Sequence, residues 1–234
     1  MGDPERAFSN AGPGGSPWAP SWLKAAGRAV MRSTGLYAAY SLLTQGPLRE
    51  DGWLRSFREG HPVDAAGEPV PWLTYPAIEF LAARVRPEWC VFEYGAGAST
   101  RWWARRVAEV VSVEHDREWY ERVRGGLPAN VSLRHVSLET GGEYSRSAAA
   151  KPGRFDVVVI DGRDRVNCAR AAMVGVNATG VIVWDNSDRP EYAEGHALLV
   201  AAGWRKVPFI GMAPVFNQKS ETAVYYRDGN VLGL

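Results

Sequence analysis

The sequence predicts an α/β protein with a doubly wound, mostly parallel sheet of seven strands. From Trp72 onward, short β-branched runs alternate with helical stretches, which is typical of a parallel sheet with helices on both faces. The two last strands are joined by a loop containing glycine and proline, which indicates a C-terminal antiparallel hairpin. The chain has 234 residues, and this length fits one such domain preceded by an extension.

Three regions follow one another along the chain. Residues 1–21 are dominated by glycine, proline and serine, so a disordered tail is expected there. Residues 22–71 are expected to form a helical extension, with one or two helices broken near Gly46-Pro47, that acts as a lid or covers an edge of the domain. Residues 72–234 are expected to form the α/β domain.

The start of the extension raises the question of a membrane span. Residues 22–43 are largely apolar, but Lys24, Arg28 and Arg32 interrupt them every four residues. This spacing favours an amphipathic helix over a transmembrane one. The first residues also lack the basic and apolar regions of a signal peptide, so we expect a cytoplasmic protein.

The domain elements are predicted from periodicity and flanking turn residues. Strands are expected at residues 90–94, 110–114, 131–136, 155–161, 181–185, 204–210 and 222–227. Helices are expected at residues 76–84, 99–109, 116–124 and 165–176.

Composition excludes several classes of function. The net charge is +1, which gives no overall attraction to nucleic acid. The two cysteines, Cys90 and Cys168, form no C-x-x-C pair and no Cys/His cluster, so neither a disulfide framework nor a zinc site is expected. We therefore expect a small molecule as the partner, and the sequence leaves open whether the protein forms a homo-oligomer.

A glycine-containing turn between the first strand and the following helix predicts a ligand site. Gly95 and Gly97 let the backbone approach a ligand closely, and the helix start offers unpaired N–H groups to an anion. The next strand ends in Glu114, where a carboxylate can accept both hydroxyls of a ribose. A dinucleotide fingerprint would carry a third glycine or alanine at Thr100, so a nucleoside with a carboxylate or phosphate group is favoured.

From about Trp72 to Arg227 the sequence resembles the class I S-adenosylmethionine-dependent methyltransferases, whose first motif is acid-x-Gly-x-Gly and whose second strand ends in an acid. The resemblance implies a Rossmann-like fold and S-adenosylmethionine as cofactor. It places the methionine part at the turn, with Glu93 near the amino group and Glu114 on the ribose. The residues that it implies for cofactor binding are Tyr75, Glu93, Gly95, Ala96, Gly97, Ser99, Glu114, His115 and Asp161.

Two later strands end in polar residues that are expected to converge. Asp161 follows one strand, and Asp185 and Asn186 follow the next, so all three should lie at the same edge of a parallel sheet. Three oxygen ligands suit Mg²⁺. In the alternative interpretation, Asp161 contacts the cofactor or caps a helix, and Asp185-Asn186 forms a turn.

This acidic arrangement is similar to that of metal-dependent O-methyltransferases acting on catechols and macrolide sugars. There a cation binds the acceptor hydroxyls and lowers their pKa. The phrases around Asp161 and Asp185, with Pro71-Trp-Leu-Thr-Tyr-Pro upstream, also resemble bacterial methyltransferases of glycan pathways. These resemblances imply a saccharide hydroxyl as acceptor.

Several residues are candidates for the proton acceptor. Asp161 and Asp164 lie in the loop after the fourth strand, and His115 follows the ribose acid. His196 and Asp188 are rivals, and a structural role for either histidine remains open.

Aromatic side chains are candidates for a wall that stacks on sugar faces. They are Trp53, Trp72, Phe209 and Phe216.

The functional prediction is an S-adenosylmethionine-dependent O-methyltransferase acting on a small polyhydroxylated acceptor with the help of Mg²⁺. Two alternatives remain. One is a metal-independent methyltransferase or an aminopropyltransferase-like enzyme on another small molecule. The other is a non-catalytic module that binds S-adenosylmethionine.

Overall fold

The structure is a computed structural model that describes residues 20, 22, 30–31 and 33–234. The chain divides into two compact units, Met1–Glu50 and Asp51–Leu234, and each is described by itself. Apart from residue 20, the predicted tail at 1–21 lies outside the described residues. The second unit includes residues 51–71 together with the sheet.

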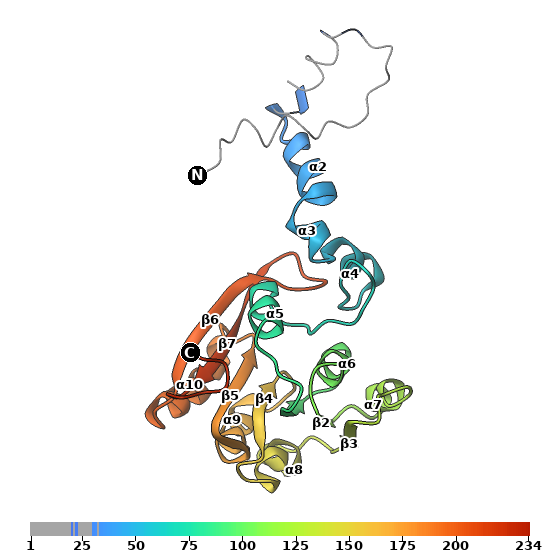
Figure 1. The fold of residues 1–234 in the computed structure, drawn as a ribbon. Helices are drawn as coiled ribbons and strands as arrows, with labels where there is room; N and C mark the ends of the chain where they lie inside the picture. The colour runs from blue at the N-terminus through green and yellow to red at the C-terminus, as the bar shows by residue number, and fades with distance from the viewer. Residues whose placement is uncertain (1–19, 21, 23–29, 32) are drawn as a thin grey trace. The chain divides into compact units, whose positions relative to one another are not determined.

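Within the described residues of the first unit, α2 (Leu36–Gln45) is followed by α3 (Pro47–Glu50) (Figure 1). Gly35 precedes α2 with a positive φ of 73°, and Gly46 ends the helix in an extended conformation. Pro47 opens α3, a position where the missing proline N–H would have no partner in any case. The predicted break at Gly46-Pro47 is confirmed.

The second unit is built on one seven-stranded sheet of order β3-β2-β1-β4-β5-β7-β6. The strands are β1 (Cys90–Tyr94), β2 (Glu109–Glu114), β3 (Val131–His135), β4 (Phe155–Ile160), β5 (Val176–Asp185), β6 (Arg205–Met212) and β7 (Lys219–Tyr226). Strands β1 to β5 pair in parallel, and β7 pairs antiparallel with both β5 and β6. The predicted mostly parallel sheet with a C-terminal hairpin is confirmed.

Helices connect the strands and lie on both sides of the sheet (Figure 1). The α-helices are α4 (Trp53–Glu59), α5 (Tyr75–Ala82), α6 (Ala98–Ala104), α7 (Arg117–Val123), α8 (Glu143–Arg146), α9 (Arg165–Gly175) and α10 (Ala193–Ala201). Two 3₁₀ helices, η2 (Ser147–Ala150) and η3 (Pro190–Tyr192), complete the described elements.

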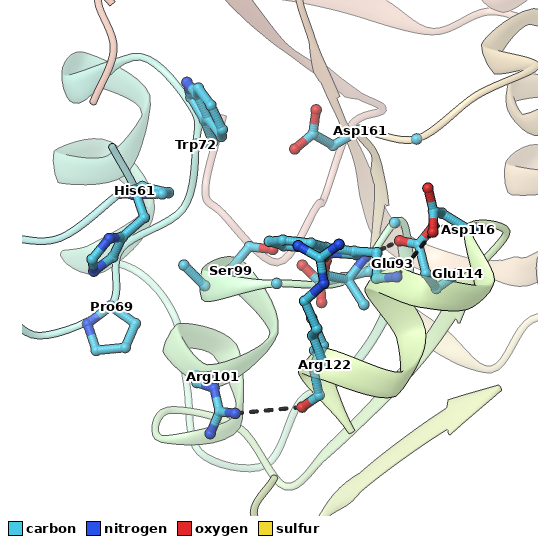
Figure 2. Close-up of a pocket in the computed structure, with 18 of the residues that line it drawn as sticks. His61, Pro69, Trp72, Glu93, Ser99, Arg101, Glu114, Asp116, Arg122 and Asp161 are labelled. Carbon is cyan, nitrogen blue, oxygen red and sulfur yellow. Dashed lines mark hydrogen bonds between the residues drawn. The ribbon is translucent and has the colours of Figure 1, made fainter. Parts of the chain in front are cut away.

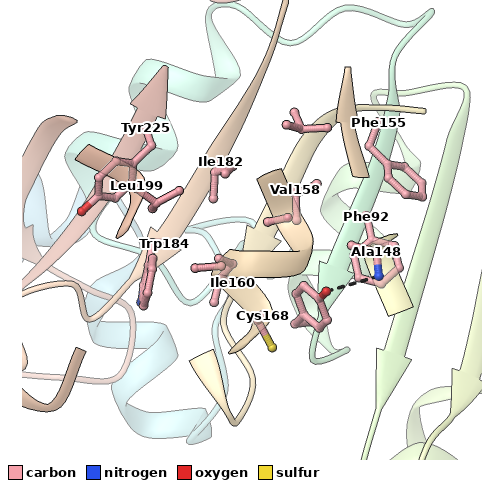
Figure 3. Close-up of a cluster of buried hydrophobic side chains, with 14 of the residues drawn as sticks. Phe92, Ala148, Phe155, Val158, Ile160, Cys168, Ile182, Trp184, Leu199 and Tyr225 are labelled. Atoms are coloured by element: carbon pink, nitrogen blue, oxygen red, sulfur yellow. Dashed lines mark hydrogen bonds between the residues drawn. The ribbon is translucent and has the colours of Figure 1, made fainter. Parts of the chain in front are cut away.

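The central strands bury side chains on both faces. On one face, Phe92, Ile160 and Trp184 pack in a cluster with residues of α8, α9 and α10 (Figure 3). On the other face, Val91 and Val159 pack with residues of α5 and α6. Because successive strand residues point to opposite faces, this alternation explains why the strands read as continuous apolar runs.

Helix α6 ends earlier than the sequence predicts. It ends at Ala104, whereas a helix to residue 109 was expected. The side-chain amide of Asn130 donates to the carbonyl oxygens of Ala104 and Val107, at 2.9 and 3.0 Å. These bonds satisfy carbonyls at the helix end, so the chain can turn and enter β2 at Glu109.

Candidate functional site

A cavity of about 750 Å³ lies at the carboxyl ends of β1, β2 and β4, within the second unit. Residues 95–99, 114–116 and 161–163 line it from the sheet side, and residues between Gly60 and Trp72 line it from the opposite side (Figure 2). The strand order reverses between β1 and β4, which is where doubly wound sheets bind ligands. The volume is typical of small-molecule sites.

The turn between β1 and α6 is held by backbone hydrogen bonds. Gly95 has a φ of 95°, a region that favours glycine, and its N–H donates to the Val113 carbonyl at 2.9 Å. The Ala96 N–H donates to Oε2 of Glu114 at 3.2 Å. The turn is therefore tied to the end of β2 before any ligand binds.

Gly97 lines the cavity. A Cβ atom added there would lie 3.8 Å from the Trp119 ring, and no other surrounding atom would lie within 4 Å. The indole Nε1 of Trp119 donates to the Ala96 carbonyl at 2.6 Å, so this ring borders the turn. Asp116 fixes the start of α7 by accepting from the Trp119 N–H at 2.9 Å. Sequence reasoning did not single out Trp119, because only the fold brings α7 to the glycine turn.

Glu93 is a buried carboxyl in the cavity wall, with 1% of its surface exposed. The Ser112 hydroxyl donates to it at 3.1 Å. Burial raises the pKa of Glu93 to about 7, while the hydroxyls of Thr100, Ser99 and Ser112 act in the opposite direction. A cationic ligand group would offset the desolvation of this carboxylate.

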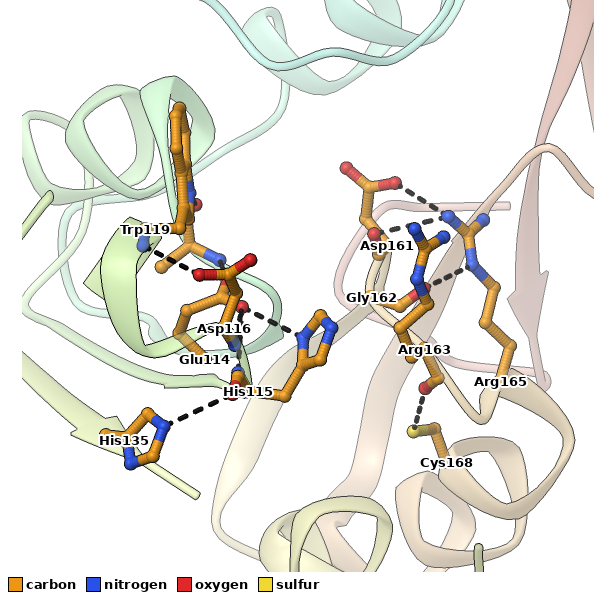
Figure 4. Close-up of polar contacts among 11 residues, drawn as sticks. Glu114, His115, Asp116, Trp119, His135, Asp161, Gly162, Arg163, Arg165 and Cys168 are labelled. Carbon is orange, nitrogen blue, oxygen red and sulfur yellow. Dashed lines mark hydrogen bonds and ion pairs between the residues drawn. The ribbon is translucent and has the colours of Figure 1, made fainter. Parts of the chain in front are cut away.

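Glu114 is fixed at the junction of β2 and the glycine turn (Figure 4). Its Oε1 accepts from the N–H groups of His115 and Asp116 at 2.8 and 2.9 Å, and Nδ1 of His115 lies 2.9 Å from the same oxygen. Hydrogen bonds from backbone N–H groups to a carboxylate are charge-assisted and therefore strong. Glu114, His115 and the turn therefore form one rigid wall of the cavity.

Asp161 lines the cavity after β4, and Arg165 holds it in place (Figure 4). Nη2 of Arg165 donates to Oδ1 and to the backbone carbonyl of Asp161, at 3.1 and 3.2 Å. Nε of Arg165 donates to the Gly162 carbonyl at 2.9 Å, and Nη1 donates to the Asp185 carbonyl. Burial raises the pKa of Asp161 to about 6, although Arg165 acts to lower it.

The side chains predicted to bind magnesium have other partners in the structure. Asp185 is buried and accepts from the Thr222 hydroxyl at 2.7 Å, and the Asn186 amide donates to the Ser220 hydroxyl at 3.2 Å. The Arg165 guanidinium, itself a cation, contacts both Asp161 and the Asp185 carbonyl. Across the part of the chain that the structure describes, no group of three His, Cys, Asp or Glu residues is placed to hold a metal.

Asp185 and Asn186 instead belong to the end of β5 and a turn, as in the alternative interpretation. Asn186 has a positive φ of 50°, which asparagine tolerates in turns. Burial raises the pKa of Asp185 to about 7, and the nearby Asp161 carboxyl adds to this effect. The two acids are therefore close, as predicted, but the cation at their junction is Arg165.

Among the base candidates, Asp161 and His115 line the cavity. Asp164 does not, because its carboxylate accepts from the Gly141 N–H and the Asn167 amide, both at 2.8 Å. These hydrogen bonds hold the loop before α9 in place.

The remaining single-residue candidates lie away from the cavity lining. Nδ1 of His196 lies 2.5 Å from the Tyr225 hydroxyl, with the two rings stacked. Asp188 is exposed on the turn after β5. Tyr75 is half-buried at the start of α5 and is not among the lining residues, so its predicted cofactor contact stays a prediction.

Three of the four predicted aromatic residues lie together, and one of them lines the cavity. Trp53 Nε1 donates to the Phe216 carbonyl at 2.7 Å, and the Trp72 and Phe216 rings lie 5.5 Å apart. Trp72 also lines the cavity. Phe209 instead packs against Phe80 of α5, at 4.7 Å between ring centroids.

No protein-family model and no curated protein sequence matches this chain. Among solved structures, the chain is similar to a precorrin-6y C5,15-methyltransferase from Geobacter metallireducens GS-15, with 16% identity, 64% of this chain and 86% of that chain covered, and a TM-score of 0.52. A methyltransferase from Geobacter sulfurreducens aligns with 20% identity over 84% of this chain and 96% of that chain, with a TM-score of 0.48. The first of these similarities and the strand order confirm the predicted Rossmann-like fold.

Proposed function

We propose that this chain is an S-adenosylmethionine-dependent methyltransferase. One observation carries the proposal: a single cavity joins the glycine turn, the two buried acids Glu93 and Glu114, and Asp161. The cofactor combines a cationic amino group, a ribose and a reactive sulfonium. The chemistry of the cavity wall fits these groups.

The cofactor-binding part of the proposal assigns a group to each wall. Glu93 faces the amino group, because a buried carboxyl is stabilised by a cation. Glu114 accepts the ribose hydroxyls, and its fixed position lowers the entropy cost of binding. The residues from Gly95 to Ser99 border the methionine part, where the open side of Gly97 leaves room.

The reaction that we propose is transfer of a methyl group to a hydroxyl of a small polyhydroxylated acceptor, such as a saccharide. When bound, the cofactor supplies an electrophilic methyl group. Asp161 accepts the hydroxyl proton, since burial raises the pKa of its carboxyl towards neutrality and makes the carboxylate a stronger base. The exposed faces of Trp72 and Phe216 fit the stacking of a sugar ring.

The proposal contains no magnesium step. Arg165 already supplies a permanent positive charge beside Asp161 and orients its carboxylate. Among the enzymes that the sequence predicts, this contact favours the metal-independent methyltransferase.

Calorimetric titration with S-adenosylmethionine and S-adenosylhomocysteine tests the cofactor. We expect micromolar binding by the wild-type protein and a loss of at least about tenfold in Glu114→Gln, because a charge-assisted hydrogen bond to each hydroxyl is weakened. Glu121→Gln, an exposed acid on α7, is the matched control and should bind normally. Absence of binding by the wild-type protein would overturn the proposal.

A further inference from the structure

Helix α2 of the first unit exposes apolar side chains. None of its residues is buried, and Leu36, Tyr40, Leu42 and Leu43 are between 36 and 59% exposed. At 100° per residue, Leu36, Tyr40 and Leu43 lie on one face of the helix. The helix contains no charged residue. Exposure of such an apolar face to water is unfavourable, so the face indicates an interaction surface.

The sequence around α2 is basic and free of acids. Residues 7–49 contain Lys24, Arg28, Arg32 and Arg49 and no aspartate or glutamate. This segment therefore carries a formal charge of +4, whereas the rest of the chain carries −3. The modest net charge of the whole protein hides a local concentration of positive charge, which suits an anionic partner.

The spacing before α2 is that of an amphipathic helix. Lys24, Arg28 and Arg32 recur every four residues, and the same spacing places Trp22 and Val30 on the other side. Trp22 and Val30 are helical and exposed in the structure, whereas the three basic residues lie outside the described part, so their placement is argued from the sequence pattern.

We propose that residues 22–45 bind in the plane of an anionic lipid surface. A basic, acid-free sequence next to a helix with exposed apolar side chains, with Trp22 and Tyr40 among the exposed aromatic residues, is typical of interfacial segments. No helix in the part of the chain that the structure describes has the length and apolar character needed to cross a bilayer. A second copy of the chain fits less well, because two acid-free +4 segments would repel each other. This inference does not depend on the proposed enzymatic function.

Flotation of the full-length protein with lipid vesicles tests the proposal. We expect it to float with phosphatidylcholine vesicles containing one quarter phosphatidylglycerol, and to float far less with phosphatidylcholine alone. The triple variant Lys24→Glu, Arg28→Glu, Arg32→Glu should lose about a hundredfold in partitioning, since each basic residue near an anionic surface contributes about fivefold.

A matched control distinguishes the effect of charges in this segment from the effect of the protein's net charge on vesicle binding. Arg86→Glu, Arg146→Glu, Lys219→Glu changes three exposed basic residues of the second unit and makes the same change in net charge. We expect this variant to bind the anionic vesicles nearly as well as the wild type. Equal losses in the two triple variants would overturn the proposal, because binding would then follow net charge alone.

The apolar face is tested by a second matched pair. Leu36→Ser, Leu43→Ser should weaken vesicle binding at least about tenfold, whereas Val200→Ser, Ile210→Ser, an exposed pair in the second unit, should not. Light scattering on the same samples reports the oligomeric state. Absence of flotation by the wild type, or loss of self-association in the α2 variant with unchanged vesicle binding, would refute the lipid surface, and the second result would assign α2 to a protein interface.

Discussion

At the residue scale, Arg165 organises the acidic end of the cavity. Its guanidinium contacts Asp161, Gly162 and the Asp185 carbonyl, and so joins the ends of β4 and β5. The sequence correctly predicted that Asp161 and Asp185 would converge, because both follow adjacent parallel strands. It gave no reason to select Arg165, since an arginine four residues after an acid is common and its role appears only when the two strands pair.

A first prediction concerns metal removal. Arg165 already supplies the positive charge at this position, so millimolar Mg²⁺ should leave both the melting temperature and the cofactor dissociation constant unchanged. A specifically bound ion would instead raise the stability of the folded state. Treatment with EDTA should likewise leave both unchanged. Thermal melts and calorimetry check this without knowledge of the acceptor. A melting temperature that falls with EDTA and recovers with Mg²⁺ would contradict the role given to Arg165.

At the scale of elements, residues 60–72 form the wall that faces the sheet. A bridge pairs Val63 with Pro69, and the Asp64 carboxylate accepts from the N–H groups of Ala66 and Glu68, both at 2.9 Å. Glu68 also forms an ion pair with Arg105, just beyond α6. The sequence predicted a lid or edge-covering extension over residues 22–71, of which this wall is the last part.

The buried Ser56 of α4 fastens this wall. Its hydroxyl donates to the Val63 carbonyl at 2.5 Å and accepts from the Val63 N–H at 3.0 Å. Ser56→Ala would leave both backbone groups without this partner, at a cost of about 1–3 kcal/mol. We predict lower thermal stability and a several-fold weaker cofactor affinity, measured by melts and calorimetry. Ser132→Ala, on the exposed side of β3, is the control and should change neither. Unchanged affinity in Ser56→Ala would show that the wall does not contact the cofactor.

Elements were predictable where local patterns decide them. The seven strands follow from β-branched runs, and the break before α3 follows from Gly46-Pro47. The end of α6 was not predictable, because it depends on Asn130, which is distant in the sequence. The helical stretch from Glu143 to Ala150 was also missed. It is short, and the fold places its Tyr144 and Ala148 in the core through contacts that no local periodicity reveals.

At the scale of the whole molecule, three acids gather at the carboxyl edge of the sheet, two of them buried (Glu93 and Asp185) and one, Asp161, partly buried. Burial raises the pKa values of Glu93, Asp161 and Asp185 to about 7, 6 and 7. The sequence placed each acid at a strand end but could not predict these shifts, because they arise from desolvation by distant parts of the chain. Burying acids at strand ends prepares the site for a ligand, but it lowers the stability of the protein when no ligand is bound.

The pH dependence of stability follows from the same shifts. A carboxyl with a raised pKa binds its proton more tightly in the folded state than in the unfolded state. This tighter proton binding stabilises the folded state fully when the pH is below the pKa of the unfolded state. The stabilisation is lost as the pH rises through the pKa of the folded state. For Glu93, folding becomes less favourable by about 3 kcal/mol between pH 4 and pH 8.

Glu93→Gln should remove this loss, because the amide has nearly the same shape and no charge to desolvate. We predict that the variant melts several degrees above the wild type at pH 8, and that this difference shrinks towards pH 5. The same variant should bind S-adenosylmethionine more weakly at pH 8, since the ligand amino group loses its carboxylate partner. Glu88→Gln, an exposed acid, should show neither effect. A wild type that melts higher than Glu93→Gln at pH 8 without ligand would mean that Glu93 is already stabilised within the protein, and the cavity would then have no need of a cation at this position.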